Sequence, residues 1–184
     1  MRKYGLYLMM LAAAIFCTTS CSDEEDNHQE RWMIANQNAI NAIKANSEYK
    51  ELKSPGGEGS IYYKEIKKGH GTEPIYYTSR MECYYKGSFA ADYPELNLKN
   101  GDVFDKLLFD DGSPFIILSG FMTLSRYSVI NGWKVALQNM VEGDKWEVWV
   151  PHQLGYGREG NGNIPGYSTL VFEMEVVKVR GIDE

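Results

Sequence analysis

The sequence predicts an α+β domain in which a bent antiparallel β-sheet wraps around one short α-helix, with a helical extension before the sheet. Three observations carry this prediction. Apolar residues recur at helical spacing before Ser54, the pattern changes to alternation after Gly59, and one helical stripe around Trp133 interrupts the alternating segments. A run of alternating segments with a single helix to cover them favours an antiparallel sheet packed against that helix.

The helical extension is expected within residues 32–57. Trp32, Ala35, Ala39 and Ile43 follow each other at steps of three and four residues, so 32–52 is predicted to be helical. The sequence SPGGEG that follows contains strong helix breakers and should end it. This helix could pack on the main domain or mediate dimerisation, and the sequence leaves both explanations open.

The main domain is expected to occupy residues 58–184. Its alternating segments place an apolar side chain at every second position, as in a strand with one buried face. Apolar residues at steps of three and four, centred on Trp133, predict the helix at 129–140. The expected strands are residues 61–66, 80–85, 103–104, 115–118, 145–150 and 170–177.

The N-terminus has the features of a lipoprotein signal peptide over residues 1–20. Arg2 and Lys3 precede an apolar run from Leu6 to Phe16, which is too short to span a membrane comfortably. The small Ser20 then precedes Cys21, which is the expected site of lipid attachment. We therefore expect an exported lipoprotein anchored to the outer membrane.

Residues 21–31 are expected to form an acidic tether. Asp23, Glu24, Glu25 and Asp26 form a compact charged run, and a solvated linker is a sufficient explanation for it. The run also resembles the acidic export signal that follows the lipidated cysteine in surface lipoproteins of Bacteroidetes. That resemblance implies exposure on the cell surface.

Composition excludes several classes of function. The net charge of −6 argues against nucleic-acid binding through the phosphates. Cys83 is the one cysteine outside the signal region, so a disulfide framework is excluded and Cys83 is expected to be a small buried apolar residue. His28 and His70 have no partners at metal-binding spacing, and His152 is expected on the surface. No metal or cofactor is predicted.

Seven short motifs in the main domain occur in a characteristic order. Each is weak by itself, but together they resemble the FKBP-type peptidyl-prolyl isomerase family over roughly residues 58–180. The motifs are Tyr84–Gly87, Val103–Asp105, Pro114–Leu118, Val129–Trp133, Met140–Asp144, Pro151–Gly157 and Ser168–Val176.

The resemblance implies a site for a proline ring. Trp133 occupies the place of the indole on which that ring sits, Asp105 matches the acid beside it, and Tyr156 matches the tyrosine that reaches the ligand carbonyl. The residues expected to be catalytic are Tyr85, Phe104, Asp105, Trp133, Tyr156 and Phe172. Those expected to bind substrate are Phe115, Ile117, Val129, Ile130 and Ile164, with the backbone at 129–130 donating to the ligand.

The implied activity is cis–trans isomerisation of X–Pro bonds in exported proteins. Rotation about such an amide has a barrier of ~18–20 kcal/mol, and no covalent bond is formed or broken. The reaction therefore needs no nucleophile, metal or cofactor. The expected partners are proline-containing polypeptides, together with the membrane through the N-terminal lipid.

Several segments depart from the family pattern. Residues 88–101 are longer than usual, residues 118–128 contain an insertion, and the glycine-rich flap at 157–166 is short. Asp110 and Asp111 stand where a basic partner for Asp105 is common, and two acids there are expected to raise the pKa of Asp105. These changes keep two rival functions open, namely a proline-binding or chaperone module without turnover and a structural lipoprotein that keeps only the fold.

Overall fold

The computed structural model describes residues 22–108, 112, 114–117 and 129–180. Contacts within the chain divide it into two compact units, with the boundary between Arg31 and Trp32. The second unit contains the sheet and the candidate site. Among the described helices, none is long and apolar enough to cross a membrane.

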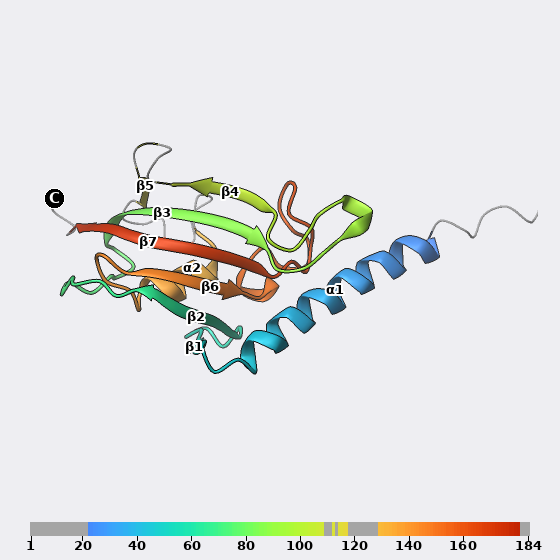
Figure 1. The fold of residues 1–184 in the computed structure, drawn as a ribbon, viewed down its shortest axis with the longest axis horizontal. Coiled ribbons are helices and arrows are strands. Elements are labelled where there is room, and N and C mark those ends of the chain that lie inside the picture. Colours follow the sequence, from blue (N-terminus) through green and yellow to red (C-terminus); the bar gives the residue numbers. More distant parts are fainter. Residues whose placement is uncertain (1–21, 109–111, 113, 118–128, 181–184) are drawn as a thin grey trace, which may run out of the picture. The chain divides into compact units, whose positions relative to one another are not determined.

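The described strands form one antiparallel sheet with the order β1–β2–β6–β7–β3–β4, and β5 also pairs with β3 (Figure 1). β3 is long enough for Tyr85–Ser88 to pair with β4 while Met81–Cys83 pairs with β5 along the same edge. The strands are β1 (Lys50–Lys53), β2 (Ser60–Lys67), β3 (Arg80–Phe89), β4 (Val103–Leu107), β5 (Phe115–Ile117), β6 (Lys145–Val150) and β7 (Leu170–Arg180). The predicted α+β class is therefore confirmed.

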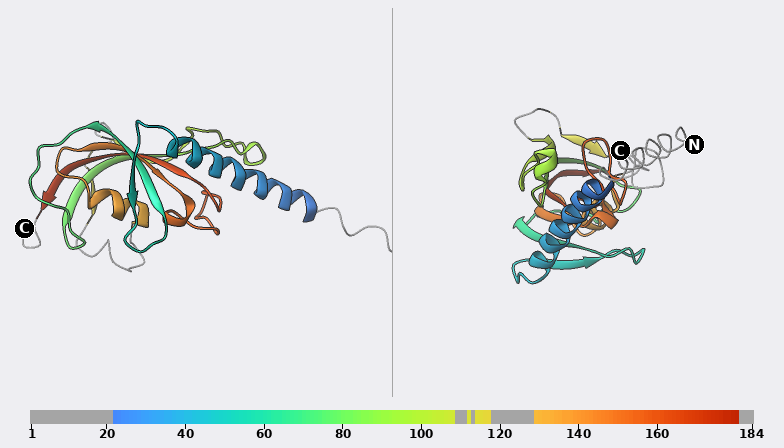
Figure 2. Two further views of the ribbon diagram at one scale, coloured as in Figure 1. Left: turned by 90° about the horizontal axis from the view of Figure 1, so that it is seen from below. Right: turned by 90° about the vertical axis from the view of Figure 1, so that its right-hand side faces the viewer.

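Register places the apolar residues of the central strands on one face. Phe172 of β7 lies between Val148 of β6 and Gly87 of β3, and the rows on either side continue the same alternation. Helix α2 (Asn131–Leu137) packs against this face, inside the curve of the sheet (Figure 2). The core between them includes Ile61, Met81, Cys83, Trp133, Val135, Ala136, Leu137, Trp146, Val148, Val150, Leu170, Phe172, Met174 and Val176.

Helix α1 differs from the prediction at both ends, since it runs from Ser22 to Lys44 and not from 32 to 52. Residues 22–31, expected to be a tether, are thus helical. Acidic residues are favoured in the first turn because they face the positive end of the helix dipole. At the other end, the Glu48 N–H donates to Asn46 Oδ1 at 3.0 Å, and such a turn competes with helix continuation.

The segment after α1 forms a hairpin. Leu52 of β1 pairs with Ile61 of β2, so the last residues of the predicted helix are a strand. The intervening SPGGEG loop is closed by a hydrogen bond from Ser54 N to Gly59 O at 2.8 Å, with Gly57 and Gly59 at φ values of 75° and 129°. These positive φ values suit glycine, so the breakers that should end a helix form a hairpin turn instead.

Helix α2 is shorter than the predicted 129–140, but the turn that follows it is tightly held. Asp144 is buried, and its two carboxylate oxygens accept the N–H groups of Gly69 at 2.7 Å and Val141 at 2.8 Å. Cys83 is fully buried, as predicted, and burial raises the pKa of its thiol to about 12.

Candidate active site

The candidate site is built around Trp133 at the start of α2. Gly132 allows the helix to approach β6 closely, because a Cβ at this position would lie 2.4 Å from Val150 Cγ1. Trp133 is 5% exposed, and its ring centroid lies 5.1 Å from Tyr85 and 5.4 Å from Phe172. Both contacts are edge-to-face, at 75° and 90°, which is a favoured geometry for aromatic pairs.

Phe104 of β4 extends this group of rings. Its centroid lies 5.7 Å from Phe172 and 5.1 Å from Phe89. A Cβ at Gly87 would lie 2.6 Å from Phe104 Cζ and 2.8 Å from Phe172 Cε1, so the missing side chain lets both rings cover β3. We call Tyr85, Phe104, Trp133 and Phe172 the aromatic cluster. Four of the six predicted catalytic residues are thus brought together.

The other two predicted catalytic residues, Asp105 and Tyr156, add polar groups beside the cluster. The Tyr85 hydroxyl donates to Asp105 Oδ2 at 2.8 Å. Burial raises the pKa of Tyr85, and the hydrogen bond to Asp105 raises it further. Burial also raises the pKa of Tyr156, while a hydrogen bond with Asn161 opposes that shift and the Asp105 charge adds to it. Both tyrosines therefore keep their hydroxyl protons at neutral pH.

The backbone before α2 offers a hydrogen-bond donor. The Ile130 carbonyl accepts the N–H groups of Trp133 at 3.0 Å and Lys134 at 3.3 Å, which fixes the first turn. No acceptor for the Ile130 N–H occurs within the described residues. Val129 and Ile130 both pack against the core while remaining partly exposed. The predicted role of this pair is therefore compatible with the structure.

The remaining predicted binding residues differ in how far the structure describes them. Ile164 packs against the core and forms a two-way backbone bridge with Asn161, with both N···O distances 2.9 Å. Phe115 and Ile117 lie in β5, where their backbones pair with Cys83 and Met81. Their side chains lie outside the described part of the structure.

Three further sequence predictions fall outside the described residues. Lipid attachment at Cys21, the 118–128 insertion and the acidic pair Asp110–Asp111 with its effect on Asp105 all stay predictions.

Sequence reasoning missed Gly87 and Phe89. Gly87 was noted as the end of a motif, but nothing local shows that two rings from other strands cover it. Phe89 continues the β3 alternation, which is the one signal that could have indicated its place behind Phe104.

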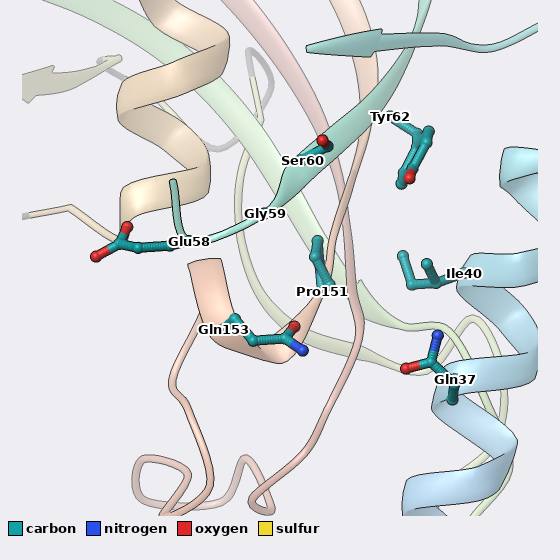
Figure 3. Close-up of a pocket in the computed structure, with 8 residues that line it drawn as sticks. All are labelled: Gln37, Ile40, Glu58, Gly59, Ser60, Tyr62, Pro151 and Gln153. Atoms are coloured by element: carbon teal, nitrogen blue, oxygen red, sulfur yellow. The ribbon is translucent and has the colours of Figure 1, made fainter. Parts of the chain in front are cut away.

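A shallow groove of about 160 Å³ lies elsewhere, between α1, the β1–β2 hairpin and the segment after β6 (Figure 3). Its one carboxylate, Glu58, accepts a hydrogen bond from Asn131 Nδ2 at 3.0 Å. The groove shares no residue with the aromatic cluster. It is lined by Gln37, Ile40, Glu58, Gly59, Ser60, Tyr62, Pro151 and Gln153.

The described residues contain no group of three or more His, Cys, Asp or Glu side chains placed to hold a metal ion. The fold and the cluster together define a class of α+β protein that presents an aromatic site on the concave face of a bent sheet, beside the N-terminus of one short helix. Chemistry at such a site depends on apolar contact and hydrogen bonding.

Comparison with known proteins is consistent with this class. A model of the family described as FKBP-type peptidyl-prolyl cis-trans isomerase matches residues 75–177, which is more than half of the chain. The chain therefore belongs to the FKBP-type peptidyl-prolyl cis-trans isomerase family, as its motifs predicted.

Individual relatives agree with the family. The chain is 39% identical over 84 residues to macrophage infectivity potentiator of Trypanosoma cruzi, covering 45% of this chain and 39% of that protein. It is 33% identical over 102 residues to FK506-binding protein 2 of Emericella nidulans, covering 55% of this chain and 65% of that protein. The chain thus spans less than two thirds of the length of each of these relatives.

Two solved structures share the fold. A peptidyl-prolyl cis-trans isomerase from Pseudomonas syringae pv. tomato aligns with a TM-score of 0.63 at 30% identity, covering 83% of this chain and 96% of that one. FkpA from Escherichia coli aligns with the same TM-score at 22% identity, covering 96% of this chain and 71% of that one. At 22% identity, the similarity to FkpA shows the fold alone.

Proposed function

We propose that this chain catalyses cis–trans isomerisation of X–Pro peptide bonds at the aromatic cluster and thereby assists the folding of other polypeptides. The observation that carries the proposal is the packing around Trp133, which holds Tyr85 and Phe172 edge-to-face within 5.4 Å of the indole. A proline ring is small, apolar and rigid, so contact with such rings removes it from water without a large entropy cost.

The physical basis of the rate increase is selective stabilisation of the twisted amide. A planar X–Pro amide is polar because of conjugation, and rotation removes that conjugation and weakens the carbonyl dipole. An apolar surround disfavours the planar form more than the twisted one, which lowers the barrier. Each 1.36 kcal/mol of this difference gives about a tenfold increase in rate.

Hydrogen-bond donors orient the substrate. The Ile130 N–H and the Tyr156 hydroxyl can each donate to a peptide carbonyl, and the raised pKa of Tyr156 keeps its proton in place. Asp105 accepts from the Tyr85 hydroxyl, which holds the Tyr85 ring beside Trp133. No step in this scheme transfers a proton.

The test is an NMR exchange or protease-coupled assay of X–Pro peptides with the full chain. Trp133→Leu removes the central ring and should lower kcat/KM by about tenfold or more, since burying an aromatic ring contributes several kcal/mol. Trp149→Leu is a matched control, because Trp149 alternates with the buried Val148 and Val150 and so faces the other side of the sheet. Its kcat/KM should stay within about twofold of the wild type. Thermal unfolding of both variants separates loss of activity from loss of folding.

Failure to accelerate isomerisation of any X–Pro peptide would refute the proposal. Peptide binding at the cluster without acceleration would instead support the rival function, a proline-binding module without turnover. Equal losses in Trp133→Leu and Trp149→Leu would show that the rings matter only for stability.

We also propose that the chain is exported and anchored by lipid at Cys21. The support comes from the sequence alone, namely the charged start, the apolar run and the Ser20–Cys21 junction. Palmitate labelling in the native host should be abolished by Cys21→Ser and retained in Cys17→Ser. Labelling that survives Cys21→Ser would refute the anchor.

Surface exposure of the anchored protein is a further part of this proposal. The acidic run Asp23–Asp26 follows the proposed lipid site after one residue, Ser22. Replacing its four acids with Asn and Gln should protect the protein from protease added to whole cells. Unchanged sensitivity to protease would mean that the acids serve only as a solvated segment.

A further inference from the structure

The loop between the short helix η3 (His152–Leu154) and β7 carries two of the residues expected to meet substrate, Tyr156 and Ile164. We call residues 155–169 the flap loop. It is folded on itself by backbone hydrogen bonds, including Tyr167 N to Gly157 O at 2.9 Å and Gly157 N to His152 O at 2.8 Å. Tyr167 has a φ of 62°, an uncommon value for a residue with a side chain. The loop therefore needs support at its base to hold this conformation.

That support comes from helix α1. Trp32 Nε1 donates to the Gly166 carbonyl at 2.9 Å, and the Thr169 N–H donates to Asn36 Oδ1 at 2.6 Å. The Thr169 hydroxyl also donates to the Asn36 carbonyl at 3.2 Å. Trp32, Asn36 and Thr169 are each 2% exposed, so water cannot replace these bonds. The two α1 side chains thus pair with loop backbone groups on both sides of Tyr167.

Asn36 is also fixed within the helix. Its Nδ2 donates to the Trp32 carbonyl at 2.9 Å, which leaves its Oδ1 turned to Thr169. The nitrogen and the oxygen of the Asn36 amide therefore both have a hydrogen-bond partner. The bond to the Trp32 carbonyl links Asn36 to Trp32, so we treat the two residues as one unit. Buried polar pairs of this kind fix a unique geometry more than they add stability.

The Trp32 ring makes a second connection, to the wall of the aromatic cluster. It stacks on the Tyr93 ring with a centroid distance of 4.8 Å and an interplanar angle of 13°. It also contacts the Phe89 ring edge-to-face, with a centroid distance of 6.3 Å. Phe89 in turn contacts Phe104 of the cluster at 5.1 Å. Tyr93 belongs to the long 88–101 segment, so this departure from the family pattern supplies the ring that covers Trp32.

We propose that Trp32 and Asn36 are positioning residues for the isomerase site, so that the functional unit begins at Trp32 and not at residue 58. They hold the flap loop at its base, and thereby hold Tyr156 and Ile164 where substrate binds. This inference rests on the proposed function for its kinetic consequence. Its structural part, the ordering of the flap loop by α1, can be measured without any substrate.

The experiment compares three variants of the full chain. Trp32→Phe keeps a ring on Tyr93 but removes the bond to the Gly166 carbonyl. Asn36→Leu removes the bond that the Thr169 N–H donates to Asn36 Oδ1, while the Asn36 backbone carbonyl stays available to the Thr169 hydroxyl. Gln37→Met is the matched control, because the neighbouring amide of Gln37 is exposed and turned to the groove of Figure 3. Hydrogen exchange of the Ile164, Tyr167 and Thr169 amides reports on the loop, and exchange of the Val148 amide in β6 reports on the core.

Trp32→Phe and Asn36→Leu should raise exchange at the loop amides by about tenfold while the Val148 amide changes less. They should also raise KM about threefold to tenfold with kcat within about twofold, as expected when one or two hydrogen bonds that organise binding are lost. Gln37→Met should change neither. A purely structural role would instead lower the folded fraction, which reduces apparent kcat at constant KM.

Two results would overturn the proposal: unchanged exchange at the loop amides in both variants, or a fall in apparent kcat with KM unchanged. An inactive wild type would refute the proposed function rather than this inference. In that case the exchange data still decide whether α1 orders the flap loop.

Discussion

Substituting Gly87 by alanine tests the geometry of the aromatic cluster with a single methyl group. The new Cβ would lie 2.6 Å from Phe104 Cζ, 2.7 Å from Phe104 Cε2 and 2.8 Å from Phe172 Cε1. Ordinary contacts begin near 3.4 Å, so the Phe104 ring must retreat by about 0.8 Å. Both rings belong to the cluster, and neither can move without disturbing its partner, since their centroids are 5.7 Å apart.

The expected cost has two parts. Overpacking a core by one methyl group typically costs about 1–3 kcal/mol of stability. A displacement near 1 Å at a site that depends on close fit can lower activity by up to about 100-fold. We therefore expect kcat/KM for X–Pro peptides to fall by about 10-fold to 100-fold in Gly87→Ala, while the protein stays folded at 25 °C.

Gly56→Ala is the matched control for this prediction. Its Cβ would have no neighbour nearer than 3.6 Å, so the same chemical change there should leave both activity and stability nearly unaltered. The assay is isomerisation of an X–Pro peptide, with urea unfolding measured in parallel. Unchanged kcat/KM in Gly87→Ala would refute the role of ring placement, because the methyl group cannot be accommodated without moving a ring.

Three further predictions concern charge. Asp105→Asn should change kcat/KM by less than about tenfold, since it alters one hydrogen bond. The wild-type rate should be flat from about pH 5 to 8, because the pKa values of Tyr85 and Tyr156 are raised and no proton is transferred. The kinetics of peptide isomerisation as a function of pH measure both. Asp144→Ala should lower the free energy of unfolding by about 2–4 kcal/mol, because the buried Gly69 N–H and the partly buried Val141 N–H lose a charged acceptor; urea denaturation measures this. Burial and the Arg158 charge lower the pKa of His152, so stability should fall as pH drops below about 6.5, and His152→Phe should reduce that fall.

The sign of the His152 effect follows from which state binds the proton first. In the unfolded chain the imidazole protonates near its ordinary value of 6.5, whereas the folded protein resists protonation until lower pH. The stabilising contribution is thus complete above that value and is lost as pH decreases. The ring also contacts Tyr167 at 5.1 Å, so His152 is partly buried and not the surface residue that the sequence suggested. A wild-type pH profile identical to that of His152→Phe would contradict this reasoning.

The other two predictions fail on different observations. A pH-dependent step in the wild-type rate that disappears in Asp105→Asn would mean that a carboxylate takes part in the chemistry. Asp144→Ala with a stability equal to that of the wild type would mean that the turn after α2 finds other acceptors.

The sheet could be predicted where packing follows the local pattern. β6 and the part of β7 up to Val176 alternate strictly because one face of each strand is buried by the core and the other carries charged residues such as Glu147 and Glu173. This alternation involves only residues that are adjacent in the sequence, so it can be recognised without knowing the partner strands. The members of the aromatic cluster could also be predicted from local sequence, since they lie in short motifs that resemble those of the FKBP-type family.

Features that depend on distant partners could not be predicted. β1 has the sequence KELK, which carries little strand signal, and it becomes a strand because it pairs with β2. The early start of α1 has no apolar stripe to reveal it. Trp32 was recognised as an apolar helical residue, but its bond to Gly166 joins positions 134 residues apart, and no local pattern encodes that contact.

The position of β1 has a consequence for how the molecule meets unfolded chains. β1 is the terminal strand in the order of the sheet, and a terminal strand can recruit another extended polypeptide through its backbone. Here that strand is only four residues long and carries Lys50, Glu51 and Lys53, all exposed. Short length and charge both discourage strand addition. Under the proposed function, in which extended polypeptides are the substrates, this edge would be guarded against co-aggregation with them.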